Sequence, residues 1–235
     1  MGMRTLGPEM KTSNEPYKWG KTEAVQRGRR GFLTLLACLS VFGSPLAQAQ
    51  TQPIRLLAFG DSLTAGYGLP ARAGFTAKLG AALQAKGLPV TVINGGVSGD
   101  TSAGGLARLD WMLADKPTHA IVEFGGNDGL RGLDPMQMEA NLDGILVKLK
   151  AANVKILLAG MRAPPNFGSA YTTAFDSVFA RLAERHKVAF YPFFLDGVAA
   201  NPQLNQADGI HPNEAGVNTV IDRILPAVLS LLAQS

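Results

Sequence analysis

Residues 54–68 read IRLLAFGDSLTAGYG and join an apolar segment directly to a glycine-flanked serine. Residues 54–59 predict a buried β-strand because they form a short apolar run rich in Leu, and Gly60 ends that run where a sharp turn is needed. In open α/β sheets, ligands collect at the carboxyl ends of the strands, which is where Ser62 follows. Ser62 is therefore placed as a nucleophile would be, although a serine here can equally be the cap of the next helix.

Strands alternate with helices along the rest of the chain. The predicted strands cover residues 54–59, 90–93, 120–124, 155–159 and 188–191. The predicted helices cover residues 74–86, 104–114, 135–152, 171–186 and 214–232. This alternation predicts a parallel sheet with both faces covered by helices. We therefore expect a single α/β domain, a three-layer α/β/α sandwich with a central parallel five-stranded sheet.

The first 49 residues have the layout of a secretory signal. Arg29 and Arg30 precede an apolar run over residues 32–42, and Ala47-Gln48-Ala49 is a small-residue cleavage pattern. The run is too short to span a membrane as a helix. We expect removal of residues 1–49, one domain over residues 50–235, and a periplasmic or secreted protein with no stable membrane span. The arginine pair also resembles a twin-arginine signal, so both export routes stay open.

Without this leader, the remaining domain is formally neutral. Seven of the 22 Lys and Arg residues and three of the 18 Asp and Glu residues lie before Gln50, which leaves fifteen of each sign. Nucleic-acid binding is therefore not expected, because its basic footprint is missing. The single cysteine, Cys38, also lies in the leader, so the domain has neither a thiol nucleophile nor a cysteine ligand for zinc. Lipidation of Cys38 is a weaker alternative, because the apolar run before it would be only six residues long.

A base for Ser62 is offered near the C-terminus, where Asp208 and His211 lie three positions apart in the segment DGIHPN. A serine hydroxyl attacks a carbonyl only if a base takes its proton, and a histidine does this well when a carboxylate fixes its tautomer. In this interpretation Asp208 orients His211, and His211 activates Ser62. A surface histidine beside a proline is the alternative that the residues alone leave open.

Two glycine-containing loops follow other predicted strands and offer hydrogen-bond donors. Gly99 lies in the loop after the second strand, and Asn127 follows the third strand in Gly-Gly-Asn-Asp. With the amide of Ser62, the Gly99 amide and the Asn127 side chain would supply three donors to a developing oxyanion. Tight turns and a helix cap would explain the same residues structurally, so each motif taken singly is weak.

Taken together, the segments GDSLTAGYG, SGDTSAGGLARL, VEFGGNDGLRG and DGIHPN, in this order, resemble the four blocks of the SGNH (GDSL-type) hydrolase family. The similarity begins near Ile54 and is greatest to the periplasmic branch of thioesterase/protease/lysophospholipases and arylesterases. It implies that Ser62 is the nucleophile and that His211 is the general base, oriented by Asp208. It also implies that Gly99 and Asn127 join the Ser62 amide in the oxyanion hole.

The resemblance also implies a mobile substrate loop, hinged at its two glycines. This loop consists of Asp128, Gly129, Leu130, Arg131, Gly132 and Leu133. The implied activity is hydrolysis of carboxylic esters or acyl thioesters through an acyl-enzyme, with arylesters, lysophospholipids or acyl-CoA as candidate small-molecule substrates. No cofactor is implied, and we expect a monomer. A carbohydrate acetylesterase and a catalytically silent lipid-binding envelope protein are the alternatives.

Motifs of other enzyme classes are missing from the sequence. No Gly-x-Gly-x-x-Gly follows the first predicted strand, so the dinucleotide fingerprint is absent. Thr64 stands where the Gly-x-Ser-x-Gly elbow of α/β-hydrolases needs its second glycine. No predicted helix carries paired His and Glu at metal-binding spacing. We therefore expect neither a metal nor a cofactor.

Overall fold

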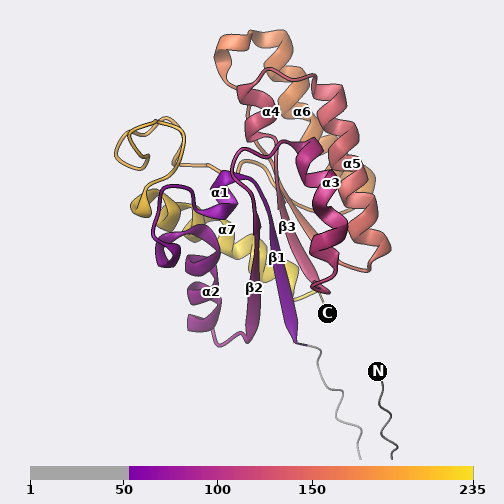
Figure 1. The fold of residues 1–235 in the computed structure, drawn as a ribbon, viewed down its shortest axis with the longest axis vertical. Helices are drawn as coiled ribbons and strands as arrows, with labels where there is room; N and C mark the ends of the chain where they lie inside the picture. Colours follow the sequence, from indigo (N-terminus) through magenta and orange to yellow (C-terminus); the bar gives the residue numbers. More distant parts are fainter. Residues whose placement is uncertain (1–52, 235) are drawn as a thin grey trace, which may run out of the picture. The chain divides into compact units, whose positions relative to one another are not determined.

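The computed structural model describes residues 53–234, which fold around one five-stranded sheet (Figure 1). All neighbouring strands are parallel, in the order β2-β1-β3-β4-β5. The strands are β1 (Ile54–Gly60), β2 (Val90–Gly96), β3 (His119–Glu123), β4 (Lys155–Ala159) and β5 (Ala189–Tyr191). The five predicted strands are confirmed, whereas the predicted export signal lies outside the described residues.

Five long helices connect and flank these strands, as the sequence predicts. They are α2 (Phe75–Ala85), α3 (Ser102–Leu113), α5 (Pro135–Ala151), α6 (Ser169–His186) and α7 (Glu214–Leu232). The start of α5 illustrates the local cause: the Asp134 side chain accepts the Met136 N–H at 2.9 Å, and Pro135 occupies the first helical position. The sequence did not predict the short helices α1 (Ser62–Ala65), α4 (Gly126–Leu130), η1 (Ala71–Ala73) and η2 (Pro165–Phe167).

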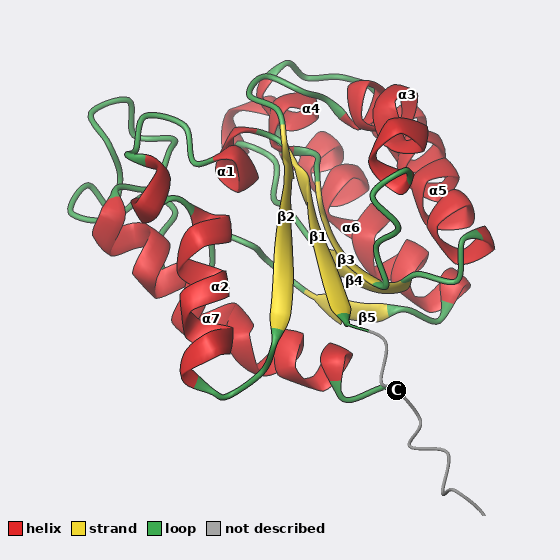
Figure 2. Cartoon of the chain, turned by 60° about the horizontal axis from the view of Figure 1, so that its bottom comes forward, coloured by secondary structure: helices red, strands yellow, loops and turns green. Residues whose placement is uncertain are grey.

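The helices cover the two faces of the sheet and complete the three layers (Figure 2). Helices α2 and α7 pack together on one face, and α3, α5 and α6 pack on the other. Helix α7 is long and apolar enough to cross a membrane by length and composition alone. Its apolar residues, including Val220, Ile224 and Val228, are buried in the core instead. This packing accounts for the composition of α7.

The central strands β1 and β3 form the most buried part of the sheet. Residues Leu56 to Phe59 of β1 are fully inaccessible, as are Ala120 to Val122 of β3. The middle residues of both strands are apolar, because helices cover both of their faces. The chain crosses to opposite sides of β1 to form β2 and β3, so the strand order reverses between β1 and β3. In such sheets this reversal opens a crevice at the carboxyl ends of the strands.

Candidate active site

The predicted nucleophile Ser62 is the first residue of α1 and follows β1 through a very tight turn. A side chain at Gly60 would place its Cβ 2.3 Å from Thr64 Oγ1 and 2.5 Å from the Glu123 carbonyl oxygen, so the turn requires glycine. Gly96 at the end of β2 is equally restricted, because its Cβ would lie 2.2 Å from the Ala65 nitrogen. These close approaches fix α1 at the crevice and bring Ser62 to the cavity described below.

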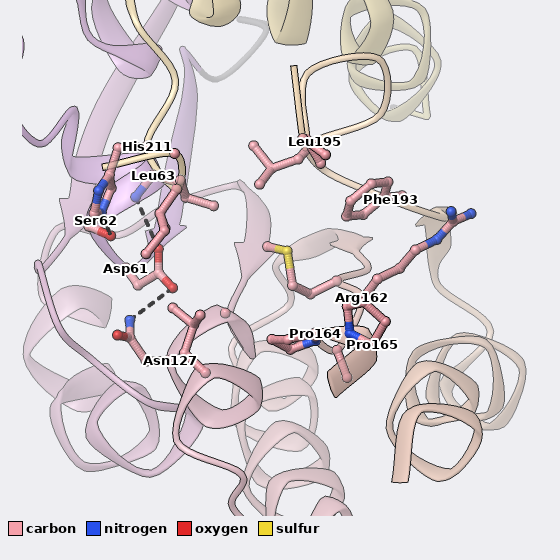
Figure 3. Close-up of a pocket in the computed structure, with 18 residues that line it drawn as sticks. Asp61, Ser62, Leu63, Asn127, Arg162, Pro164, Pro165, Phe193, Leu195 and His211 are labelled. Carbon is pink, nitrogen blue, oxygen red and sulfur yellow. Dashed lines mark hydrogen bonds between the residues drawn. The ribbon is translucent and has the colours of Figure 1, made fainter. Parts of the chain in front are cut away.

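The structure brings the candidate residues Ser62, His211 and Asp208 together in a continuous hydrogen-bonded series. His211 Nε2 lies 2.8 Å from Ser62 Oγ, and His211 Nδ1 lies 2.7 Å from Asp208 Oδ2. Figure 3 shows His211 beside Ser62 at one end of a pocket. The histidine and the carboxylate come from the irregular segment between β5 and α7, whereas the serine belongs to α1. The imidazole is therefore placed to take the hydroxyl proton.

The Asp208 carboxylate accepts three hydrogen bonds from its own turn. Besides the imidazole, its Oδ1 accepts the backbone N–H groups of Ile210 at 2.9 Å and His211 at 3.0 Å. The backbone N–H of His211, then its side chain and the N–H of Ile210, lower the pKa of Asp208 to about 2. Asp208 is thus a carboxylate at neutral pH, and it accepts the hydrogen bond that fixes the orientation of the His211 ring.

Contacts that the sequence did not predict hold the segment of His211 in place. The Tyr67 ring packs on the His211 ring, with 4.6 Å between their centroids. The Gln206 side chain donates from Nε2 to the Tyr67 carbonyl at 2.8 Å and to the Pro212 carbonyl at 3.0 Å. Tyr67 lies only five residues after Ser62, so these contacts link the segment of His211 directly to the segment of Ser62.

Asn127 lies in α4, shortly after β3. Its side chain points toward the turn of residues 60–62, which carries Ser62 and is called the nucleophile turn below (Figure 3). Its Nδ2 donates to the Asp100 carbonyl at 2.9 Å and to Asp61 Oδ2 at 3.2 Å. The carboxyl ends of β1, β2 and β3 are therefore joined through this one amide.

Gly99 lies in the loop between β2 and α3 with a φ of 85°, a conformation that glycine adopts without strain. The Arg131 guanidinium donates to the Gly99 carbonyl at 2.8 Å. The next residue, Asp100, forms an ion pair with Arg108 Nε at 2.5 Å, and Arg108 Nη2 also donates to the Gly60 carbonyl at 2.9 Å. Arg108, which the sequence reasoning missed, therefore ties the Gly99 loop to the nucleophile turn.

A second carboxyl group lies buried beneath the nucleophile turn. Glu123 at the end of β3 accepts the Thr64 hydroxyl at 2.8 Å and the Asp61 N–H at 3.4 Å. Burial, and then the nearby Asp61 carboxyl, raise the pKa of Glu123 well above its ordinary value. Burial likewise raises the pKa of Asp61 to about 6. Neither carboxyl carried a signal in the sequence beyond its position at the end of a strand.

The predicted substrate loop is partly helical and partly anchored, because its first three residues belong to α4. Asp128 is buried and accepts the Ser102 N–H at 2.9 Å and the Ser102 hydroxyl at 2.6 Å. The interpretation of residues 128–133 as a loop is therefore wrong for residues 128–130, since this contact with the first turn of α3 stabilises a helix there. Leu130 alone of the six residues lines the cavity.

The remaining loop residues lie around the edge of this helix. Gly132 has a φ of 62° and lies against the Phe167 ring, and the Leu133 carbonyl accepts the Tyr171 hydroxyl at 2.8 Å. Gly129 is buried, with Phe175 beside the position that a Cβ would occupy. The proposed mobility of the segment, and the role of its glycines as hinges, stay predictions.

A cavity of about 410 Å³ opens beside Ser62, His211 and Asn127. Apart from these residues its wall is mostly apolar; the side chains include Leu63, Leu130, Met161, Pro164, Phe193 and Leu195. Figure 3 shows Pro164, Pro165 and Phe193 across the cavity from Ser62. The sequence pointed to only part of this wall, because the segments of Phe193 and Leu195 have no motif. Within residues 53–234, no cluster of three or more His, Cys, Asp or Glu side chains could hold a metal ion.

A hydroxyl, an imidazole and a carboxylate linked in this order perform nucleophilic attack by serine with general-base assistance. Their position at the crevice of a parallel sheet, beside an apolar cavity, defines the class as serine hydrolases. A model of the GDSL-like Lipase/Acylhydrolase family matches residues 58–218. The chain belongs to this family.

Named relatives agree with this assignment. Esterase TesA of Pseudomonas aeruginosa is 43% identical over 202 residues, covering 85% of this chain and 98% of the relative. Thioesterase 1/protease 1/lysophospholipase L1 of Escherichia coli is 46% identical over 159 residues, covering 67% and 75% of the two chains. A crystal structure of TesA superposes with a TM-score of 0.73 at 43% identity, covering 75% of this chain and 99% of that one. The protein is thus an ester-hydrolysing serine hydrolase with the three-layer fold predicted from the sequence.

Proposed function

We propose that this protein hydrolyses carboxylic esters and acyl thioesters with Ser62 as nucleophile, His211 as general base and acid, and Asp208 as the group that orients His211. The observation that carries the proposal is the hydrogen-bonded series of these three side chains, with 2.8 Å between Ser62 and His211 and 2.7 Å between His211 and Asp208. The relatives named esterase and thioesterase support the same reaction.

In the first half of the reaction, Ser62 Oγ attacks the acyl carbon while His211 Nε2 takes the hydroxyl proton. The tetrahedral intermediate collapses as His211 gives this proton to the alcohol or thiol leaving group, which leaves an acyl-serine. In the second half, His211 takes a proton from water, the resulting hydroxide attacks the acyl-serine, and the acid is released as the proton returns to Ser62. The charge of Asp208 stabilises the imidazolium in both halves.

Three donors hold the negative charge of the tetrahedral intermediate: the backbone amides of Ser62 and Gly99 and the Asn127 side chain. The Asn127 side chain lines the cavity beside Ser62, and the Gly99 loop is tied to it through the Asp100 carbonyl. Donors fixed in advance stabilise a developing charge strongly, because they need no reorganisation during the reaction.

The apolar cavity supports an acyl group longer than acetyl. A volume of about 410 Å³ lies within the usual range for small-molecule sites, and an apolar wall favours burial of methylene groups. We propose small-molecule esters, acyl-CoA thioesters and lysophospholipids as the substrate classes. A sugar acetylesterase would need only a shallow acyl site, and a silent lipid-binding protein would have no use for a base bonded to a serine.

We further propose that the enzyme is exported and acts as a monomer in the periplasm or outside the cell, after removal of residues 1–49. The basic residues, the apolar run and the small-residue pattern of the leader support export. The neutral charge of residues 50–235 supports the absence of a nucleic-acid partner. Sequencing the N-terminus of the protein recovered from its host, where Gln50 is the expected first residue, tests the cleavage.

Initial rates on p-nitrophenyl esters from acetyl to palmitoyl, with and without the Ser62→Ala substitution, test the proposed activity. We expect a maximum at medium or long chains and its loss in Ser62→Ala, with unchanged circular dichroism. A maximum at acetyl would favour the sugar acetylesterase. If no ester of any chain length is hydrolysed in a way that Ser62→Ala abolishes, the hydrolase proposal is contradicted and lipid binding is favoured.

A further inference from the structure

The side-chain amide of Asn127 has two N–H groups, and both already have acceptors within the protein. One donates to the Asp100 carbonyl at 2.9 Å, and the other donates to Asp61 Oδ2 at 3.2 Å. An amide nitrogen has no third hydrogen to give. If Asn127 donates to the oxyanion, one of these two hydrogen bonds must be exchanged for it.

The contacts around the two acceptors indicate which bond is exchanged. The Asp100 carbonyl belongs to a loop that is fixed by the ion pair between Asp100 and Arg108 and by the bond from Arg108 to the Gly60 carbonyl. Its hydrogen bond to Asn127 is also the shorter one. Asp61, in contrast, lines the cavity together with Ser62 and Asn127. The N–H directed to Asp61 is therefore the one that faces the reacting group.

The Asp61 carboxyl group is itself held in a fixed orientation. Its Oδ1 accepts the Leu63 N–H at 3.0 Å, which caps α1, and its Oδ2 accepts from Asn127. The backbone N–H of Asp61 points to Glu123 beneath the turn. Oδ1 therefore caps α1, and Oδ2 accepts a hydrogen bond from Asn127, the proposed oxyanion donor.

We propose that Asp61 is a positioning residue whose Oδ2 holds the Asn127 amide in the resting enzyme and releases one N–H to the oxyanion as charge develops. This inference rests on the proposed hydrolase function. Because one hydrogen bond to an oxygen anion replaces another, the donor turns little and needs little reorganisation. Without Asp61, the amide would be held on one side only, and a donor displaced by a fraction of an ångström loses much of its effect.

Two substitutions of Asp61 distinguish its hydrogen bond to Asn127 from its hydrogen bond to Leu63, which caps α1. Asp61→Ser keeps an oxygen suited to a helix cap but is too short to hold Asn127 as well. Asp61→Asn keeps the size of the side chain, but when its one acceptor oxygen caps Leu63, its NH2 group faces the Asn127 amide and cannot accept from it. Each is made alone and together with Asn127→Ala, and kcat, KM and the thermal midpoint are measured for each variant on the best p-nitrophenyl ester.

If Asp61 acts through Asn127, each single substitution lowers kcat by about ten- to hundredfold with little change in KM. In the Asn127→Ala background, the same substitutions then cause no further loss of kcat. An equal loss in both backgrounds would overturn the inference, because Asp61 would then act only through the structure of α1. Full activity of Asp61→Ser would overturn it as well. A failure of Ser62→Ala to abolish turnover of the unsubstituted enzyme would instead contradict the proposed function.

Discussion

Glu123 is a fully buried carboxyl group whose Oε1 has no hydrogen-bond partner among the described residues. Burial of an ionised carboxylate is costly, and this cost appears as a raised pKa. Glu123 therefore keeps its proton in the folded protein at pH values at which the unfolded chain has released it. The neutral acid still accepts from Thr64 and supports the turn that carries Ser62.

This shift predicts that stability falls as the pH rises. The pKa of Glu123 is higher in the folded than in the unfolded state, so the folded protein binds more protons and the free energy of unfolding decreases above about pH 4.5. Asp61 contributes with the same sign between its ordinary value and about 6. Glu123→Gln keeps a neutral side chain and removes this titration. Urea unfolding from pH 5 to pH 8 should give a shallower decrease for Glu123→Gln than for the unsubstituted protein.

The depressed pKa of Asp208 acts in a different pH range. Its stabilising contribution is present above the ordinary value near 4 and is lost only as the pH falls toward about 2. It therefore does not obscure the comparison between pH 5 and pH 8. Equal slopes for Glu123→Gln and the unsubstituted protein would show that Glu123 is ionised in the folded state.

Asn127 gives a second prediction for a single residue. Removal of one oxyanion donor typically lowers kcat by about 10²- to 10³-fold, because the other donors remain. Asn127→Ala should lose activity to this extent while Ser62 still reacts with a fluorophosphonate, since the bond from His211 to Ser62 does not involve Asn127. The measurements are kcat on a medium-chain ester and the extent of labelling. Equal kcat for both proteins would remove Asn127 from the mechanism.

Among the elements, the long helices and the strands were predictable and the short helices were not. Helix α5 has a cap, a proline at its start and a long apolar stripe, all of which are local signals. Helix α4 has five residues, two of them glycine, and no periodicity. It is held by Asp128, which binds Ser102 from a segment 26 residues away. A contact of this kind leaves no pattern in the sequence.

The same contact predicts the effect of Asp128→Ala. This substitution leaves the Ser102 N–H buried without its acceptor, at a cost of about 1–3 kcal/mol in the free energy of unfolding. It should also lower kcat, because Asn127 lies in the same short helix. Asp110→Ala is a suitable control, since it removes an exposed ion pair with Lys148 on the outer surface. Urea unfolding and ester hydrolysis measure both effects, and a change no larger than that of the control would contradict the anchoring role.

At the scale of the whole molecule, the sequence predicted the layers and that the candidate site residues lie at one edge of the sheet, but not the shape of the cavity. Ser62, Gly99 and Asn127 each follow a strand that ends at the same edge of the sheet, so parallel topology alone brings them together. Much of the cavity wall, in contrast, comes from the segments after β4 and β5. Their packing depends on tertiary contacts such as the bond from the Ala163 N–H to Asp176 Oδ1 at 2.9 Å.

The cavity as a whole predicts how chain-length preference can be changed. Ala163 lines the cavity, so Ala163→Phe should fill part of it and lower the rate on long esters while the rate on the acetyl ester is kept. Ala170→Phe is the matched control, because Ala170 is exposed at the start of α6 and does not line the cavity. Both variants are compared across p-nitrophenyl esters of increasing length. Identical profiles for the two variants would show that acyl chains bind elsewhere.

The hydrogen bond between Ser62 and His211 joins residues that are 149 positions apart in the chain. During synthesis the nucleophile turn leaves the ribosome long before the base does, and β2 to β5 are made in between. A nascent or truncated chain that ends before His211 therefore has Ser62 but lacks its proposed base. With Ser62 and His211 in their proposed roles, hydrolysis begins only when the segment of His211 docks beside α1, so the appearance of activity would report this docking.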